Sequence, residues 1–525
     1  MFQTNFVPSL MHAEQIHELR NAHYNELAGI NLEVERARAL LSKLEYKQNE
    51  LRVVIGELEA LLSPIRRMPT EIIAKVFEHC IHSDEGQPRA NAVEAPLLLA
   101  QVCSAWRELL FSHPCLWTSL EIIFPAKSSE WTKFIQNKTM ILRLWLLRSK
   151  SLPISLTLAD FGAPCIPWTS LMLLDQDLLT AASRLETLAI SLRSSTMSSI
   201  LTFAQCHLPA LRHLELHDST FFTERQHPAP LILHSAPLLR SFSVSWCSLD
   251  LQEFQVPWGQ LTELSVLYDA GYQWEPRHSD YVDILAQCRS LVSCSLGIGW
   301  VDDAVRSEDN RSVALPHLET LRLRFYKYSS YHQRLLNTLE APELRELDVQ
   351  NGKRVMGPYR GQRECFPLIV RSAHTLEKLV LDSIDAPDSD VVECLEHASN
   401  LRSLRFLCSP MRILRDLIPA LTTSPPGGCA APMSQATCPR MENLHFRCSS
   451  GVAVSAIADM VRSRCGGTTA VRGTPCLKKF RLDYAHVDHG PDIRDQKIAA
   501  LSSLLKDCVE QGLELTLTKS HASGK

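Results

Sequence analysis

The stretch LRHLELH, residues 211–217, decides the fold of this 525-residue chain. In a β-strand, Leu214 and Leu216 would face one side, and the polar residues between them would face the other. The same pattern, an apolar residue followed by x-x-L-x-L or a close variant, recurs along the chain. Its eleven copies begin at residues 185, 211, 239, 261, 291, 318, 344, 376, 401, 441 and 477.

The spacing of these copies indicates a repeat architecture. Successive copies begin 26, 28, 22, 30, 27, 26, 32, 25, 40 and 36 residues apart, and leucine-rich repeats have a period of about 20–29 residues. We therefore predict an α/β solenoid of irregular leucine-rich repeats over residues 185–520, with about 11 repeats, parallel strands and outer helices. Expected helices are 282–288, 332–340 and 391–399, and 511–519 is the expected closing strand. Two segments rich in proline or glycine, 422–437 and 463–475, are predicted surface loops.

A heptad pattern precedes the repeats. Ser63-Pro64 ends the pattern. Its seam consists of residues spaced alternately by three and four: Leu27, Ile30, Val34, Ala37, Leu41, Leu44, Gln48, Leu51, Ile55, Leu58 and Leu62. The pattern predicts a coiled-coil-like helix over 27–63, about 54 Å long, after a flexible N-terminus at 1–26. Two interpretations stay open, self-association through residues 27–62 and one long helix that folds back on the following domain.

Residues 64–120 follow a different pattern, that of three short helices. In MPTEIIAKVFEHCI (68–81) the apolar residues share one helical face, and those of LLLAQVCSAWRELL (97–110) share another. A polar loop separates the two helices, and SHPCLWTSL (112–120) closes the unit. A domain of this size is too small to be generously stable without a partner. Residues 121–184 are expected to form a bridge into the repeats.

Three segments of this unit together resemble the F-box, most closely that of fungal, basidiomycete-type F-box proteins with C-terminal leucine-rich repeats. The segments are MPTEIIAKVF (68–77), LLLAQVCSAWREL (97–109) and HPCLW (113–117). LRLWLLRSKSLPISLTL (142–158) resembles the bridge of such proteins. Met68 replaces the usual leucine, and the loop at 82–96 is long. The resemblance implies a receptor that docks on a Skp-type adaptor, joins a cullin–RING ubiquitin ligase and binds a protein substrate through its repeats. The alternative is a repeat scaffold for protein interactions without ligase association.

The resemblance also implies a docking surface, although packing inside the three-helix unit is the competing interpretation for each residue. The adaptor-binding candidates are Met68, Pro69, Ile72, Ile73, Val76, Leu99, Val102, Trp106, Leu116 and Trp117. On the repeats, the side chains that alternate with the leucines become mostly basic in the last three copies. This favours an acidic or phosphorylated protein segment as substrate, unless the face is an ordinary solvated surface. The substrate-binding candidates are Arg322, Arg324, Arg405, Arg447, Lys479 and Arg481.

Composition argues against nucleic-acid binding, a disulfide scaffold and a membrane span. The net charge is −4 and the pI about 6.6, so no basic field favours nucleic acid. Seventeen scattered cysteines without a CxxC motif favour reduced thiols in the cytoplasm or nucleus, and no apolar run predicts a membrane span. We predict no enzyme, cofactor or metal. The histidine pairs of HLELH (213–217) and HVDH (486–489) are the nearest approach to a metal site, and each has no further predicted ligand.

Overall fold

The chain divides into two compact units, Met1–Phe77 and Glu78–Lys525. The computed structural model describes residues 7–81, 87–125, 130–160, 166, 168–193, 196–197, 207–218, 233, 236–245, 254–267, 278–298, 311–325, 331–351, 366–382, 388–407, 414, 416–423, 437–448, 452–465, 476–485 and 491–520.

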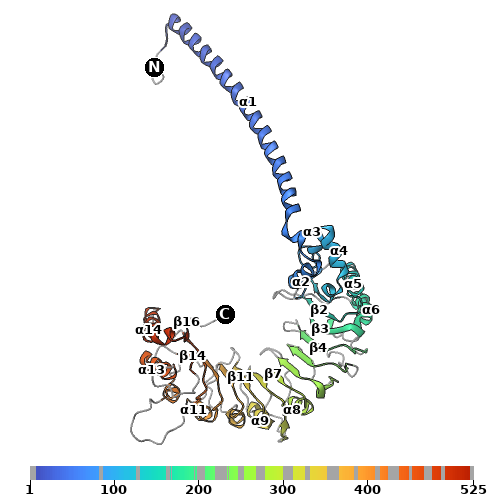
Figure 1. Cartoon of the computed structure of the whole chain (residues 1–525), viewed down its shortest axis with the longest axis vertical. Coiled ribbons are helices and arrows are strands. Elements are labelled where there is room, and N and C mark those ends of the chain that lie inside the picture. Colours follow the sequence, from blue (N-terminus) through green and yellow to red (C-terminus); the bar gives the residue numbers. More distant parts are fainter. Residues whose placement is uncertain are drawn as a thin grey trace. The chain divides into compact units, whose positions relative to one another are not determined.

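The first unit is dominated by helix α1, Leu10–Leu62 (Figure 1). The helix is 53 residues long and buries none of them. It ends at Ser63, whose ψ of 129° leaves the helical region, because the following Pro64 cannot continue the helix. A short 3₁₀ turn, η1 (Pro64–Arg67), leads into α2 (Thr70–Ile81). The prediction of a flexible segment over 1–26 is wrong for residues 10–26, which are helical because their polar, non-branched residues favour helix without a heptad seam.

The second unit is built on one sheet of fourteen parallel strands, which pair in the order of the chain, apart from two outlying short strands. The strands of the large sheet are β1 (Ser119–Phe124), β2 (Ile154–Asp160), β3 (Leu185–Leu192), β4 (His213–Asp218), β5 (Ser241–Ser245), β6 (Glu263–Leu267), β7 (Ser293–Ile298), β9 (Thr320–Phe325), β11 (Glu346–Asn351), β12 (Lys378–Asp382), β13 (Ser403–Leu407), β14 (Asn443–Cys448), β15 (Lys479–Ala485) and β16 (Glu514–Ser520). The short strands β8 (Val313–Ala314) and β10 (Leu339–Glu340) pair separately.

Helices line one side of this sheet. Figure 1 shows α8, α9, α11 and α13 outside the curve that the strands follow. The unit's helices are α3 (Leu99–Val102), α4 (Ser104–Ser112), η2 (Pro114–Trp117), α5 (Trp131–Arg148), α6 (Trp168–Ala181), η3 (Ala182–Arg184), η6 (Trp258–Gln260), α8 (His278–Gln287), α9 (Tyr331–Thr338), α10 (Phe366–Arg371), α11 (Asp388–His397), α12 (Leu417–Leu421), α13 (Val454–Arg464), α14 (Pro491–Leu504) and α15 (Lys506–Glu510). Successive helices from α8 to α14 pack against one another, apart from segments outside the described residues.

Each of the eleven sequence motifs coincides with one strand, from β3 to β15, and the closing strand is β16. In-register pairing stacks the buried residues, as in Leu214 on Phe242 and Leu216 on Val244, and both rows are shielded from water. A long parallel sheet with helices on one side is therefore present, in a solenoid-like arrangement. It begins earlier than predicted, because β1, which starts at the end of the expected F-box, pairs with β2 in the expected bridge, and β2 pairs with β3. Their alternation of buried residues follows the same period of two.

Predicted helices and loops have mixed outcomes. The helices expected at 282–288, 332–340 and 391–399 correspond to α8, α9 and α11. Residues 424–436 and 466–475, the greater part of the two predicted loops, lie outside the described residues. The start of the second loop is corrected, since α13 continues to Arg464.

Candidate protein-interaction surfaces

Helix α2 divides its apolar residues between two faces. Pro69 immediately precedes the helix, and its carbonyl accepts hydrogen bonds from the amides of Ile72 (3.1 Å) and Ile73 (3.2 Å). Ile73 and Phe77 are buried. By contrast, Ile72 is 50% exposed and Val76 42%. The single apolar face predicted for this helix is therefore wrong, because adjacent residues lie 100° apart on a helix, and the buried face takes in Ile73 and Phe77 but not Ile72 and Val76.

Exposed apolar residues follow one another along the start of α2. We define the α2 stripe as Met68, Pro69, Ile72 and Val76, which recur at helical spacing and are half-buried or exposed. An apolar stripe left in water is a feature of surfaces that bind other proteins. Four of the ten adaptor-binding candidates lie on it.

The second predicted helix is broken. Cys103 is extended, with φ −159° and ψ 171°, and separates α3 from α4. The break turns the candidates of this segment in different directions: Leu99 is buried, Val102 is 58% exposed and Trp106 is half-buried. The prediction that these residues share one continuous helical face is wrong. Cys103 instead caps α4, where its sulfur accepts from the Trp106 amide at 3.5 Å.

Leu116 and Trp117 are core residues of the second unit, 1% and 0% exposed. The indole Nε1 of Trp117 donates to the Leu110 carbonyl at 3.0 Å. Its ring meets that of Trp145 edge-on, with centroids 4.8 Å apart, and the Arg148 guanidinium lies 4.4 Å from it. A side chain held from three sides and closed to solvent offers no docking surface, so packing is the correct interpretation for both residues.

The side of the sheet opposite the buried leucines presents rows of polar side chains, and all six substrate-binding candidates lie there. Five are exposed and Arg447 is half-buried. Four of them form ion pairs with residues of the same face: Arg322–Glu346 (3.3 Å), Arg447–Asp382 (3.7 Å), Lys479–Glu514 (2.7 Å) and Arg481–Asp483 (3.1 Å). Among the described residues, Arg324 and Arg405 form no ion pair.

The mostly basic character predicted for the last three copies holds on β13–β15, whose outward positions carry four Lys or Arg and one Asp. It does not extend over the wider face: on β9 and β11–β16, the outward positions of the three aligned rows hold seven Lys or Arg and five Asp or Glu, a net charge of +2. The sequence argument missed Asp382, Asp483 and Glu514, although each alternates with buried residues in the same way. Parallel strands in register bring these acids within reach of cations on neighbouring strands.

Asp483 is the most tightly held carboxylate on this face. It accepts from His445 Nε2 at 2.9 Å, from Arg481 Nε at 3.1 Å and from the Thr518 hydroxyl. Burial by itself would raise the pKa of Asp483, but these hydrogen bonds outweigh it and hold the pKa well below its usual value. The cluster fixes β14, β15 and β16 to one another.

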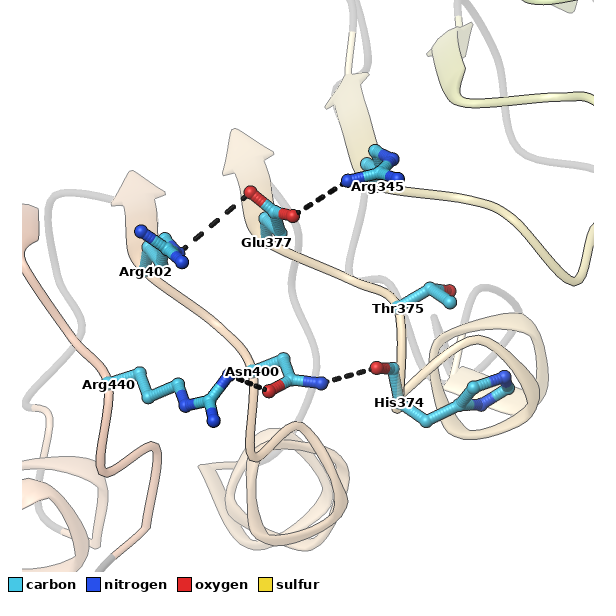
Figure 2. Close-up of a pocket in the computed structure, with 7 residues that line it drawn as sticks. All are labelled: Arg345, His374, Thr375, Glu377, Asn400, Arg402 and Arg440. Atoms are coloured by element: carbon cyan, nitrogen blue, oxygen red, sulfur yellow. Dashed lines mark hydrogen bonds and ion pairs between the residues drawn. The ribbon is translucent and has the colours of Figure 1, made fainter.

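A ladder of alternating charges runs beside these rows, one position before each strand. Figure 2 shows Glu377 between Arg345 (3.0 Å) and Arg402 (3.9 Å). The ladder continues to Glu442, which Arg402 (3.4 Å) and Lys478 (2.7 Å) contact. The hydrogen bond from Lys478 lowers the pKa of Glu442.

A polar depression of about 200 Å³ adjoins the ladder and is lined also by His374, Thr375, Asn400 and Arg440; Figure 2 shows these side chains together. Asn400 donates to the His374 carbonyl and accepts from Arg440 at 2.7 Å. Most of these groups bond to one another. The side chains that line the depression therefore hold neighbouring repeats together.

The cysteines and histidines are the candidate reactive or metal-binding groups. The ten cysteines whose side chains the structure describes are free thiols, of which Cys80, Cys103 and Cys476 are exposed. Burial raises the pKa of Cys288, Cys394 and Cys438 to about 12, so these three thiols are unreactive at neutral pH. Within the described ranges, no group of three ligands could hold a metal ion. His217 bonds Ser245 (2.8 Å), and residues 486–489 lie outside the described part. No helix of that part is both long and apolar enough to cross a membrane.

Comparison with protein-family models finds no match, and comparison with curated proteins finds none. The functional argument therefore rests on the residues and surfaces of the chain itself.

Proposed function

We propose that this protein is a substrate-recognition adaptor of a Skp–cullin–F-box type ubiquitin ligase. The α2 stripe docks on a Skp-type adaptor, and through it on a cullin–RING complex, while the open face of the sheet binds a protein substrate. Bond formation belongs to the partner proteins, so the chain needs neither an active site nor a cofactor. Such a ligase works in the cytoplasm, the nucleus or both.

The α2 stripe is the observation that carries this proposal. Ile72 and Val76 leave half or nearly half of their surface in water, although burying an aliphatic side chain stabilises a complex by up to about 1.5–3 kcal/mol. Val102 and the half-buried Trp106 stay among the candidates. Four of the ten candidates are excluded from the proposed docking surface because they are buried: Ile73, Leu99, Leu116 and Trp117.

The test is capture of a purified Skp-type adaptor by the full chain. Val76→Glu should abolish capture, because a carboxylate cannot be buried unpaired in an apolar interface. Val370→Glu is the matched control, since Val370 is also a helical valine and is also 42% exposed. If the wild-type chain captures no adaptor, or if both variants lose capture equally, the ligase proposal is wrong.

A second function, a protein-interaction scaffold without ligase association, is favoured by the break at Cys103. A docking surface that spans the second helix would need the continuous face that this break removes. The scaffold needs only the open face of the sheet. Substrate capture without adaptor capture would support it.

The substrate proposal is an acidic or phosphorylated protein segment that contacts Arg324 and Arg405. These two guanidiniums form no ion pair among the described residues and can therefore accept a ligand's charge without losing an internal partner. The double variant Arg324→Glu/Arg405→Glu should reduce capture of phosphorylated proteins from a cell extract, quantified by mass spectrometry. The double variant Arg36→Glu/Lys43→Glu, on the exposed helix α1, controls for the same change in net charge. Unchanged capture by the double variant would refute the assignment.

A further inference from the structure

Helix α1 carries a long apolar seam whose side chains are exposed to solvent along its whole length. None of its residues is buried, and the aliphatic seam members between Leu27 and Leu62 are 39–67% exposed. Most helical stability in proteins comes from packing of an apolar face. A seam of five heptads needs a partner with the same 3–4 spacing, which a second copy of α1 provides.

We propose that residues 27–62 of two copies of this chain pair as an antiparallel coiled coil, in which residue i lies opposite residue 85−i of its partner. In an antiparallel pair, each a position meets a d position. With Leu27 at a and Ile30 at d, the layers formed are Leu27–Leu58, Ile30–Ile55, Val34–Leu51, Ala37–Gln48 and Leu41–Leu44, and symmetry makes each of them twice.

The first argument for this register comes from the two irregular members of the seam. Gln48 is the seam's polar member and Ala37 its smallest. The antiparallel register brings them into one layer, where the small Ala37 leaves room for the Gln48 side chain to reach water with its amide. Parallel pairing would instead place Ala37 on Ala37, which leaves a gap, and Gln48 on Gln48, which buries two amides.

The second argument comes from the charges that flank the seam. In the antiparallel register the e positions of the two helices flank each other, and Arg38 lies two residues from the level of the partner's Glu45, twice per dimer. Parallel pairing would bring Arg38 to Glu33 but also Lys47 to Arg52, a repulsion that also occurs twice. Arg38 contacts Glu35 of its own helix at 2.8 Å, an exposed pair that is weak enough to yield.

The antiparallel register separates the ends of the two helices. Leu62 of each copy lies opposite residue 23 of the other, so the two Leu62 residues are about 58 Å apart along the axis. The remainder of each chain therefore continues from an opposite end of the coiled coil. Such a dimer presents two copies of the open sheet face and can engage a substrate that has two binding segments. The dimer itself does not depend on the ligase proposal.

Oligomeric state tests the seam. Sedimentation equilibrium of the full chain should give twice the chain mass of 59.1 kDa. Leu44→Glu should raise the dimer dissociation constant roughly 100-fold or more, because each dimer contains the changed layer twice. Leu32→Glu is the matched control, since Leu32 is 54% exposed and Leu44 56%, but Leu32 lies off the seam. A monomeric wild-type chain, a larger assembly or a dimer insensitive to Leu44→Glu would overturn the proposal.

Orientation is tested by distances between spin labels in the full-length wild-type background, introduced through unnatural amino acids because the chain has seventeen cysteines. Labels at Ala60 should lie about 52 Å apart along the axis, and labels at Ala39 about 10 Å, from the rise of about 1.5 Å per residue. A parallel dimer would bring both pairs of labels close together. Short distances at both positions would therefore refute the antiparallel register.

Discussion

Replacing Trp117 should destabilise the start of the sheet selectively. Trp117→Ala removes a side chain that is 0% exposed, which costs about 3–5 kcal/mol of unfolding free energy. It also removes the edge-on contact with Trp145, which contributes about 0.5–1.5 kcal/mol. The Leu110 carbonyl loses its hydrogen bond from the indole, at a further cost of about 1 kcal/mol. Because these contributions overlap, we expect about 5 kcal/mol in total.

Trp117→Phe separates these contributions, since it keeps most of the buried ring and removes the hydrogen bond. We expect it to cost about 2 kcal/mol. In a sheet where each strand contacts only its neighbours, the loss should remain near the altered residue. Trp117 immediately precedes β1 in the sequence.

Hydrogen exchange of the backbone amides is the assay, because it measures local unfolding along the sheet. Trp117→Ala should accelerate exchange in β1 and β2 by roughly three to four orders of magnitude and leave β13–β15 unchanged. Trp258→Ala is the matched control: Trp258 is 6% exposed and precedes β6, so its effect should centre on β5–β7. Unchanged protection of β1, or an equal loss across all strands, would refute this account of Trp117 and the local character of the sheet.

Three further changes have defined outcomes. Asp483→Asn should lower the unfolding free energy at neutral pH by about 2 kcal/mol. Because the folded pKa of Asp483 is depressed, wild type loses this advantage as the pH falls below about 4, and urea titrations at several pH values should show the two proteins converging. Arg464→Leu removes the donors to the carbonyls of Leu421, Thr437 and Cys438 and should cost about 3–5 kcal/mol in guanidinium unfolding, because each buried carbonyl left without a donor costs about 1–3 kcal/mol. Gly56→Ala should stabilise α1 by about 0.5–1 kcal/mol, seen as a higher melting temperature of the helical signal, since the added methyl group meets nothing within 4 Å; an unchanged or lower temperature would contradict this.

The sequence by itself determined the strands and the long helix. The L-x-x-L-x-L period decides which residues of each strand are buried, because alternation is local to the strand, and all eleven motifs form strands. The heptad seam likewise decides that residues 27–62 are helical. Motif matching failed for β1 and β2, whose sequences SLEIIF and ISLTLAD alternate as the other strands do but lack the full repeat motif.

Only the tertiary structure decided which candidate residues are accessible. Helical periodicity groups Ile72 with Ile73, but it does not say which of the two is buried. Trp117 looks like an interface residue in sequence and is a core residue, because Leu110, Trp145 and Arg148 surround it. The charge of the open face also depends on pairing across strands: Lys479 meets Glu514 only after the chain has passed through two helices. Ion pairing across strands, and the choice of which of two adjacent apolar residues on a helix is buried, depend on residues distant in the sequence, so a local pattern does not specify them.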